Sequence, residues 1–213
     1  MIGELEHRVR EVRGEPEGAI VLLHGRGADE HDLFPLFDHL DPDGRLVGVC
    51  PRGPLMLPPG GAHWYVVRRV GYPDPATFFP TFETLSAWLD GFLDDRGIEP
   101  ARTVIGGFSQ GAVMSYSLGL GASRPLPAAV LAFSGFIPAV DGFDFDLEGH
   151  KQVPVAIAHG IDDPVISVSF AQRARDLLQS TGYEVSYRES PIAHAIDPAA
   201  VADAREVLSG ALR

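Results

Sequence analysis

The sequence predicts an α/β protein built on a doubly wound, mostly parallel sheet, and three observations support this prediction. Short apolar runs alternate with helix-like segments along the whole chain, which is the order that builds such a sheet. Several runs are apolar at consecutive residues, as in strands that helices cover on both faces. The 213 residues suit one domain of this class, and no linker or internal repeat divides them. We therefore expect a single domain over residues 1–213.

The apolar runs define the expected strands and, with them, the place of a functional site. The runs are "AIVLLHG" (19–25), "RLVGVCP" (45–51), "TVIGGFS" (103–109), "AAVLAFSG" (128–135), "VPVAIAHG" (153–160) and "YEVSYRE" (183–189). The charged stretch "EHRVREVR" (6–13) is expected to add a strand at the sheet edge. Ligands of open α/β sheets bind beyond the carboxyl ends of the strands. Residues that directly follow the runs are therefore the candidates for function.

The segments between the runs have helical patterns over 77–96, 109–121, 167–181 and 197–212. In the first, apolar residues from Phe78 to Phe92 recur at helical spacing, so we expect this stripe to belong to the core rather than to a ligand groove. The third is expected to use Ser167 as its N-cap. The last opens with Asp197 as N-cap and Pro198 at the first helical position.

Composition excludes several classes of function. The formal net charge of −12 makes the surface repel phosphate backbones, so we expect no nucleic-acid partner. The single cysteine, Cys50, cannot form an intrachain disulfide and is expected to be a small buried apolar residue. The start of the chain has no secretory signal pattern, and no run of about 18 apolar residues occurs. We therefore expect a cytoplasmic protein without stable membrane insertion; the oligomeric state stays open, with a homodimer as one option.

The stretch GFSQG (107–111) matches the pattern G-x-S-x-G between an expected strand and an expected helix. This is the context of a nucleophile elbow, a sharp turn that exposes a serine hydroxyl above the sheet. Gly107 and Gly111 would let strand and helix approach closely, and the helix N-terminus favours developing negative charge. We therefore expect Ser109 to be a nucleophile. For Gly106 we expect only close packing against a neighbouring strand.

A serine nucleophile needs a general base, and after an elbow of this kind the order along the chain is Ser, then Asp or Glu, then His. Three histidines follow Ser109. His150 comes before the strand at 153–160, and His159 ends that strand, ahead of the expected acid. His194 follows the last strand and precedes the last helix, so we expect it to be the base.

The acid that orients the base should follow the strand at 153–160. Asp162 and Asp163 stand side by side there, before Pro164. One should accept a hydrogen bond from His194, while the other is a turn residue. The residues alone do not choose between the two.

Acyl transfer also needs preorganised donors that hold an oxyanion. One is expected to be the backbone N–H of Gln110, the residue after the nucleophile, and the other comes from the loop after an early strand. The stretch "LLHGRGADEHD" (22–32) supplies that loop, and we expect the Arg26 backbone N–H to be the second donor. The Arg26 side chain should face solvent, and His24 should hold the loop by hydrogen bonds.

Four stretches together resemble the carboxylesterase/phospholipase family of α/β-hydrolases, which includes the acyl-protein thioesterases. They are LLHGRG (22–27), GFSQGA (107–112), HGIDDPV (159–165) and AHAID (193–197). The resemblance covers about residues 19–212 and implies the α/β-hydrolase fold, with backbone donors at Arg26 and Gln110. The family's H-G-x-x-D motif implies that Asp163, not Asp162, is the triad acid. Two departures stand out: Ala193 replaces a usual glycine before the triad histidine, and no acid follows the Trp-Tyr pair at 64–65.

Loop lengths predict how substrate reaches Ser109. The segment 136–152 is too short for a helical cap, so we expect an open site without a cap domain. Its rim should be formed by Phe136, Ile137, Phe143 and Phe145. The long insert at 51–75 is expected to supply an apolar substrate-binding wall beside Ser109, made of Leu55, Met56, Trp64 and Tyr65. The alternative is that this insert packs as a loop that supports the sheet edge.

Together, these features predict a serine hydrolase that cleaves a small-molecule ester or thioester through an acyl-enzyme on Ser109. Its catalytic residues would be Ser109, Asp163 and His194, with no metal and no cofactor needed. One alternative is a non-enzymatic ligand-binding module on the same fold, which would have a damaged triad. Others are a lactone or dienelactone-type hydrolase, although dienelactone hydrolases use a cysteine nucleophile, and a peptidase, which would need a cap or an added domain.

Overall fold

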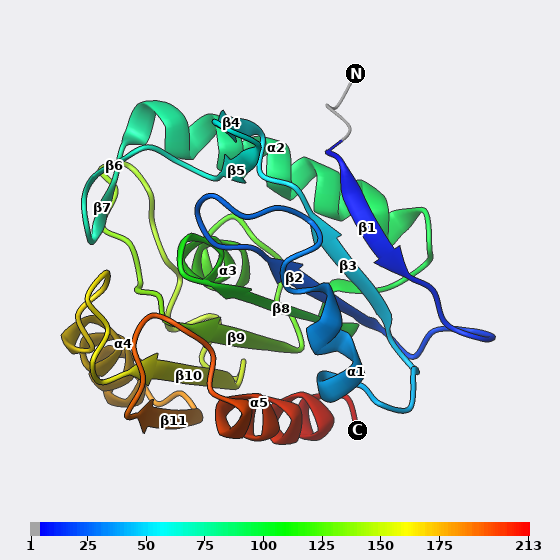
Figure 1. The fold of residues 1–213 in the computed structure, drawn as a ribbon. Coiled ribbons are helices and arrows are strands. Elements are labelled where there is room, and N and C mark those ends of the chain that lie inside the picture. The colour runs from blue at the N-terminus through cyan, green and yellow to red at the C-terminus, as the bar shows by residue number, and fades with distance from the viewer. Residues whose placement is uncertain (1–4) are drawn as a thin grey trace.

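The computed structural model describes residues 5–213 and centres on a seven-stranded sheet (Figure 1). The strands lie in the order β1 (His7–Arg10), β3 (Val47–Pro51), β2 (Ala19–Leu23), β8 (Thr103–Phe108), β9 (Ala129–Phe133), β10 (Val155–Gly160) and β11 (Val185–Ser190). All neighbours pair in parallel except β1, which pairs antiparallel with β3 at the edge. The predicted strands, the edge strand and the mostly parallel sheet are confirmed.

Helices cover both faces of the sheet. They are α1 (Phe37–Leu40), α2 (Pro75–Asp94), α3 (Gln110–Leu120), α4 (Ser169–Ser180) and α5 (Pro198–Ala211). Successive side chains of a strand point to opposite faces, so Ile20 and Leu22 of β2 share a core with α1 and α5. Val21 and Leu23 share the other core with α2 and α3, and α4 covers β10 beside α3. This two-sided cover is the doubly wound arrangement that the sequence predicts.

The helix termini follow the expected capping chemistry with one exception. Asp197 caps α5, with its Oδ1 accepting the Ala199 N–H at 2.9 Å, as predicted. The prediction that Ser167 caps α4 is wrong, because the helix begins at Ser169 and Val168 is its N-cap, without a side-chain cap bond. Ser167 lies one residue before this N-cap, where its Oγ accepts the Ser169 N–H at 3.4 Å and its carbonyl accepts the Phe170 N–H at 3.0 Å. The phenylalanine stripe of α2 is buried, as expected.

The segment between β3 and α2 contains two small hairpins that the sequence did not predict. The first pairs β4 (Leu55–Leu57) with β5 (Gly61–His63), and the second pairs β6 (Val67–Arg69) with β7 (Tyr72–Pro73). Two 3-10 turns were also not predicted, η1 (Phe34–Leu36) and η2 (Pro100–Arg102). Residues 134–154, all described, contain no helix between β9 and β10, which agrees with the absence of a cap domain.

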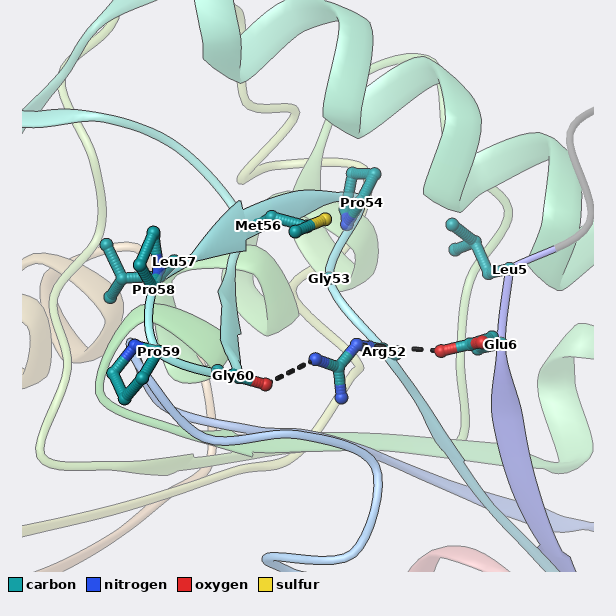
Figure 2. A pocket seen from close by; sticks show the side chains of 11 residues that line it. Leu5, Glu6, Arg52, Gly53, Pro54, Met56, Leu57, Pro58, Pro59 and Gly60 are labelled. Atoms are coloured by element: carbon teal, nitrogen blue, oxygen red, sulfur yellow. Dashed lines mark hydrogen bonds and ion pairs between the residues drawn. The ribbon is translucent and has the colours of Figure 1, made fainter.

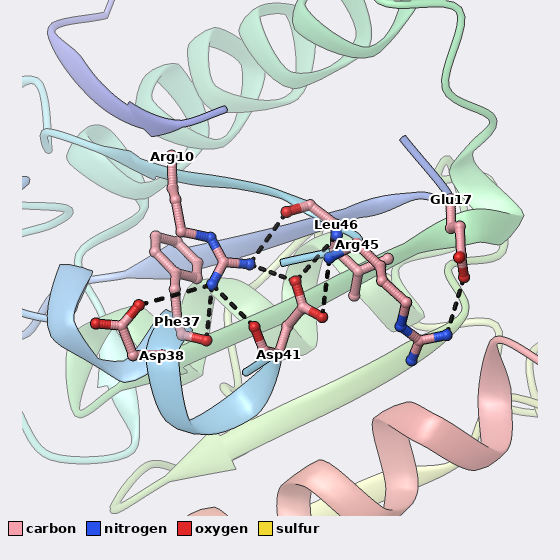
Figure 3. Close-up of polar contacts among 7 residues, drawn as sticks. All are labelled: Arg10, Glu17, Phe37, Asp38, Asp41, Arg45 and Leu46. Carbon is pink, nitrogen blue, oxygen red and sulfur yellow. Dashed lines mark hydrogen bonds and ion pairs between the residues drawn. The ribbon is translucent and has the colours of Figure 1, made fainter. Parts of the chain in front are cut away.

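A partly buried arginine, Arg10, fastens the edge strand β1 to the end of α1 through the buried Asp41 (Figure 3). Arg10 donates to the carbonyl oxygens of Phe37 at 2.9 Å and Leu46 at 3.1 Å, and it forms an ion pair with Asp41. The Asp41 carboxylate also accepts the Leu46 N–H at 3.0 Å. Hydrogen bonds of this kind compensate the cost of burying the Asp41 carboxylate, so this contact anchors the edge strand to α1.

Two further observations concern the whole described chain. Cys50 is buried as predicted, and burial raises the pKa of its thiol. Within residues 5–213, no helix combines the length and the apolar composition that crossing a bilayer requires.

Candidate active site

Ser109 occupies a sharp turn between β8 and α3. Its backbone has φ 56° and ψ −115°, a left-handed region that costs a non-glycine residue free energy. The turn is held in place by the Ser109 N–H, which donates to the carbonyl of Phe133 on the neighbouring strand at 2.9 Å. Such local strain is typical of a nucleophile elbow.

The glycines around Ser109 are required by close approach, as predicted. A Cβ atom on Gly111 would lie 1.8 Å from the carbonyl oxygen of Leu23, and one on Gly107 would lie 2.4 Å from the carbonyl carbon of Gly111. A Cβ on Gly106 would lie 3.1 Å from side-chain atoms of both Leu22 and Leu131. Gly106 therefore packs closely against the strands on either side, which confirms the expectation for this residue.

The structure brings Ser109, His194 and Asp163 into one chain of hydrogen bonds. Nε2 of His194 lies 2.9 Å from Oγ of Ser109, and its Nδ1 lies 2.6 Å from Oδ2 of Asp163. A carboxylate can only accept, so the Nδ1 proton points to Asp163 and Nε2 is free to accept the serine hydroxyl proton. This is the arrangement that a serine nucleophile, its base and an orienting acid require.

Asp163, rather than Asp162, takes the orienting position, in agreement with the family motif. Its buried carboxylate accepts the N–H groups of Val165 at 2.8 Å and Ile166 at 2.9 Å through Oδ1. Burial alone would raise the pKa of Asp163, but the hydrogen bonds from Ile166, His194 and Val165 outweigh it and lower the pKa. Asp162 is exposed, and its N–H donates to the carbonyl of Ile192 at 3.1 Å.

His159 is a second histidine at the same carboxylate, and sequence reasoning missed this contact. Its Nε2 lies 2.8 Å from the carbonyl oxygen of Ile166 and 3.2 Å from Oδ2 of Asp163. Burial lowers the pKa of His159, so the ring is held neutral behind the triad. The H-G-x-x-D stretch carries the signal, because it places a histidine four residues before the acid. His150, by contrast, bonds to the carbonyl oxygens of Asp146 and Arg124.

The loop that carries His194 is fixed from two sides. The Phe108 ring lies against the His194 ring, with centroids 4.7 Å apart. Ser134, which follows β9, has φ 52°, and its Oγ donates to the carbonyl oxygen of Ala195 at 3.3 Å. Among the described residues, Ser109 and Ser134 are the non-glycine residues with positive φ. Ala193 is not one of them, so alanine in place of the family's glycine causes no backbone strain.

The loop after β2 has the form expected of an oxyanion loop. His24 is buried and donates from Nδ1 to the carbonyl of Gly25 at 2.7 Å, while its Nε2 accepts the Gly53 N–H at 2.9 Å. This agrees with the structural role predicted for His24, and burial lowers its pKa. The Arg26 side chain is exposed, and no backbone carbonyl in residues 5–213 accepts the Arg26 N–H. The oxyanion role of Arg26 and Gln110 stays a prediction.

The prediction that the insert forms an apolar wall beside Ser109 is wrong. Trp64 is 0% and Tyr65 is 2% exposed, and both belong to the core between the sheet and α2. Leu55 is half-buried in the β4–β5 hairpin. Met56 is 83% exposed and lines a pocket of about 550 Å³ together with Arg52 (Figure 2). No residue of the triad lines this pocket, so the insert behaves largely as the packed, supporting loop that was the alternative.

The expected aromatic rim is also largely part of the core. Phe143 packs edge-on against Phe78, with ring centroids 5.2 Å apart, and against Phe82 at 4.9 Å. Phe136 is buried beside Phe170. These side chains turn inward because packing against the core removes their apolar surface from water.

Two arginines near the second hairpin have local partners. Arg68 forms an ion pair with Asp74 at 2.7 Å, and Arg69 lies over the Tyr72 ring at 3.7 Å from its centroid. Both side chains remain exposed to solvent. The two side chains are therefore solvated charges with local partners rather than a shared anion site.

Comparison with known proteins assigns this arrangement to a family. The family model described as Phospholipase/Carboxylesterase matches residues 5–212. The chain belongs to the phospholipase/carboxylesterase family. Membership makes it an α/β-hydrolase and implies carboxylic ester hydrolase activity.

Individual members of the phospholipase/carboxylesterase group show how far the similarity extends. Acyl-protein thioesterase 1 of Debaryomyces hansenii is 25% identical over 225 residues, which cover 97% of this chain and 96% of the relative. Acyl-protein thioesterase 1 of Cryptococcus neoformans is 30% identical over 180 residues, which cover 78% and 75%. Esterase PE8, known from a crystal structure, has 27% sequence identity to this chain and a TM-score of 0.81. The match covers 98% of this chain and 99% of the esterase chain. The crystal structure of the Bacillus cereus carboxylesterase has the same fold, with a TM-score of 0.82 and 22% sequence identity. The match covers 97% of this chain and 94% of the carboxylesterase chain.

Proposed function

We propose that this chain hydrolyses small-molecule carboxylic esters and thioesters through an acyl-enzyme on Ser109. The observation that carries the proposal is the hydrogen-bond chain from Ser109 through His194 to Asp163, at 2.9 and 2.6 Å, at a strained turn that begins a helix. Family membership supports it, because the reaction class belongs to the family. A binding module without activity is disfavoured, because such a module has no need of this chain of bonds.

The reaction follows from the geometry in two balanced steps. Oγ of Ser109 attacks the acyl carbon while Nε2 of His194 takes the hydroxyl proton, and the bond to the leaving oxygen or sulfur breaks as His194 returns that proton to it. Water then attacks the acyl-enzyme, gives a proton to His194 and releases the acid, and Ser109 regains its proton. Asp163 holds the imidazole in the required tautomer and stabilises its charged form. The Arg26 and Gln110 N–H groups stabilise the oxyanion in both steps.

The proposal includes thioesters because the named relatives include acyl-protein thioesterases as well as a carboxylesterase and an esterase. The described segment 134–154 between β9 and β10 contains no helix that could cover Ser109, which fits either class of leaving group. A dienelactone-type nucleophile is disfavoured because the elbow holds a serine. The cytoplasmic location and the homodimer stay predictions from the sequence.

The test is a substrate profile of the purified chain. Rates are measured with nitrophenyl esters of increasing acyl length and, beside them, with acyl-thioester substrates of matched length. The proposal expects turnover of at least one series by the wild type and none above background by Ser109→Ala. Equal rates for the two proteins would overturn it. The ratio of ester to thioester rates at matched acyl length then decides which class the site prefers.

A further inference from the structure

The side chain of Gln110 links the nucleophile elbow to a distant loop. Gln110 is the first residue of α3 and is 4% exposed. Its Oε1 accepts the Trp64 N–H at 3.1 Å, and its Nε2 donates to the carbonyl of Tyr65 at 2.9 Å. Because one partner is a donor and the other an acceptor, the orientation of this amide is fixed by its bonds. The side chain thus bonds the backbone of two consecutive loop residues, Trp64 and Tyr65, much as a paired strand would.

Trp64 extends this link to the loop after β2. Its indole Nε1 donates to the carbonyl of His24 at 2.8 Å, and its ring lies against the His24 ring, with centroids 5.0 Å apart. His24 directly precedes Gly25 and Arg26, the stretch that carries the second expected oxyanion donor. The backbone of Gly27 is tied to the same insert, since its N–H donates to the carbonyl of Ala62 at 2.8 Å.

The bonds therefore form one continuous path between the two expected oxyanion donors. It starts at Gln110, whose own N–H is one donor, passes through the Gln110 side chain and Trp64, and reaches His24 and then Arg26. Gln110 and Trp64 are both buried, so water does not compete for these bonds. A donor contributes to catalysis only when it lies at hydrogen-bond distance from the developing oxyanion, and a misplacement of about 1 Å costs about 100-fold in rate.

We propose that the Gln110 side chain and the Trp64 indole are positioning residues that set the spacing of the two oxyanion donors. The inference rests on the proposed function, because it concerns the transition state of acyl transfer at Ser109. It gives Gln110 two separate tasks: its backbone N–H stabilises the oxyanion, and its side chain holds the other donor in register. It also explains why a tryptophan of the insert is buried beside the elbow instead of facing substrate.

The test compares Gln110→Met and Trp64→Phe with wild type and with Gln172→Met. Gln110→Met keeps the length of the side chain and loses both hydrogen bonds, while Trp64→Phe keeps an aromatic ring and loses the indole N–H. Gln172 makes a side-chain bond to Glu189 on the β11 side of the sheet at 2.9 Å, so Gln172→Met is a matched control that should keep wild-type kcat. Kinetics are measured with one nitrophenyl ester, together with thermal denaturation of each variant.

The proposal expects kcat to fall about 10- to 100-fold in both variants, with KM within about 3-fold of wild type. The acid limb of the pH–rate profile should not move, because His194 and Asp163 are untouched. The double variant Gln110→Met/Trp64→Phe should lose little more than either single variant, since both break the same path.

Several results would overturn the inference. They are wild-type kcat in both variants, a change in KM alone, a shifted acid limb, or losses that multiply in the double variant. If Gln110→Met does not fold, Trp64→Phe decides, since a phenyl ring still occupies part of the space of the indole. An inactive wild type would instead contradict the proposed function, so the two failures are distinguishable.

Discussion

Nδ1 of His194 lies 2.6 Å from Oδ2 of Asp163, and the Asp163 carboxylate is buried. The adjacent Asp162 is exposed. Two neighbouring carboxylates of the same chemistry thus have different environments, because the turn directs Asp163 under the N–H groups of Val165 and Ile166. The relation between His194 and Asp163 therefore depends on the path of this turn.

Asp163→Asn and Asp162→Asn should separate these two carboxylates in function. An amide at 163 cannot accept the Nδ1 proton of His194 with the strength of a carboxylate and favours the wrong tautomer, so kcat should fall by about 10³- to 10⁴-fold. Asp162→Asn should stay within about 3-fold of wild type. Steady-state kinetics with a nitrophenyl ester measures both. Similar losses in the two variants, or the reverse order, would remove Asp163 from its assigned role.

Stability should fall as pH drops below about 6.5, the ordinary pKa of histidine. Burial lowers the pKa values of His24 and His159 in the folded state. At pH values between each lowered pKa and about 6.5, the histidine is protonated in the unfolded chain but not in the folded chain. The free energy of unfolding therefore rises with pH, by about 1.4 kcal/mol per pH unit for each such proton. His159→Gln keeps a donor near Nε2 and cannot titrate, so its slope should be smaller.

Chemical denaturation at a series of pH values measures that slope. His39→Gln is the matched control for the substitution itself, because His39 is exposed. Asp163 contributes in the acid range with the same sign, because its pKa is lowered on folding: its stabilisation is present above about 3.9 and is lost as pH falls through the folded value. A slope unchanged by His159→Gln would show that His159 titrates alike in both states.

Gly111→Ala and Gly91→Ala should change stability in opposite directions. A Cβ on Gly111 would lie 1.8 Å from a backbone oxygen, so the elbow must distort and the free energy of unfolding should fall by several kcal/mol, on the order of 3. Gly91 is an exposed residue inside α2, and a Cβ there meets nothing within 4 Å. Alanine at 91 should therefore stabilise by about 0.5–1 kcal/mol. Thermal unfolding tests the pair, and a tolerated Gly111→Ala would contradict the packing described here.

Arg10→Met should destabilise the chain far more than Arg45→Met (Figure 3). Removing Arg10 leaves the buried carboxylate of Asp41 without its cation, a change that costs about 3–5 kcal/mol. Arg45 pairs with Glu17 at 3.0 Å, and both side chains are about half exposed, so its loss should cost about 0–1 kcal/mol. Urea denaturation measures both values. Equal effects would mean that the edge strand does not depend on the buried ion pair.

The sequence predicts most of the sheet and the residues at its carboxyl edge, because parallel strands are continuous apolar runs and the elbow has a local pattern. The order of elements was enough to single out His194 among three histidines. The choice between Asp162 and Asp163 could not come from adjacent residues alone, because it depends on which carboxylate the turn buries. The family motif supplied what local chemistry could not.

The insert between β3 and α2 was predicted least well. It has no periodicity, so nothing in the sequence says which way Trp64 and Tyr65 face, and their aromatic character suggested a substrate wall. The backbone groups of these residues are buried and need partners, and Gln110 provides them from far along the chain. Such a pairing is visible only once the fold places the two segments together.

The central claim is that Ser109 is the nucleophile of an ester hydrolase, and covalent labelling tests it most directly. A fluorophosphonate should react with Oγ of Ser109, forming an oxygen–phosphorus bond and releasing fluoride, while His194 takes the proton. Intact-mass spectrometry should find one adduct per chain, peptide mapping should place it on Ser109, and ester hydrolysis should fall in proportion to labelling. A chain that stays unlabelled and active, or a Ser109→Ala variant that labels as fast as the wild type, would contradict the account.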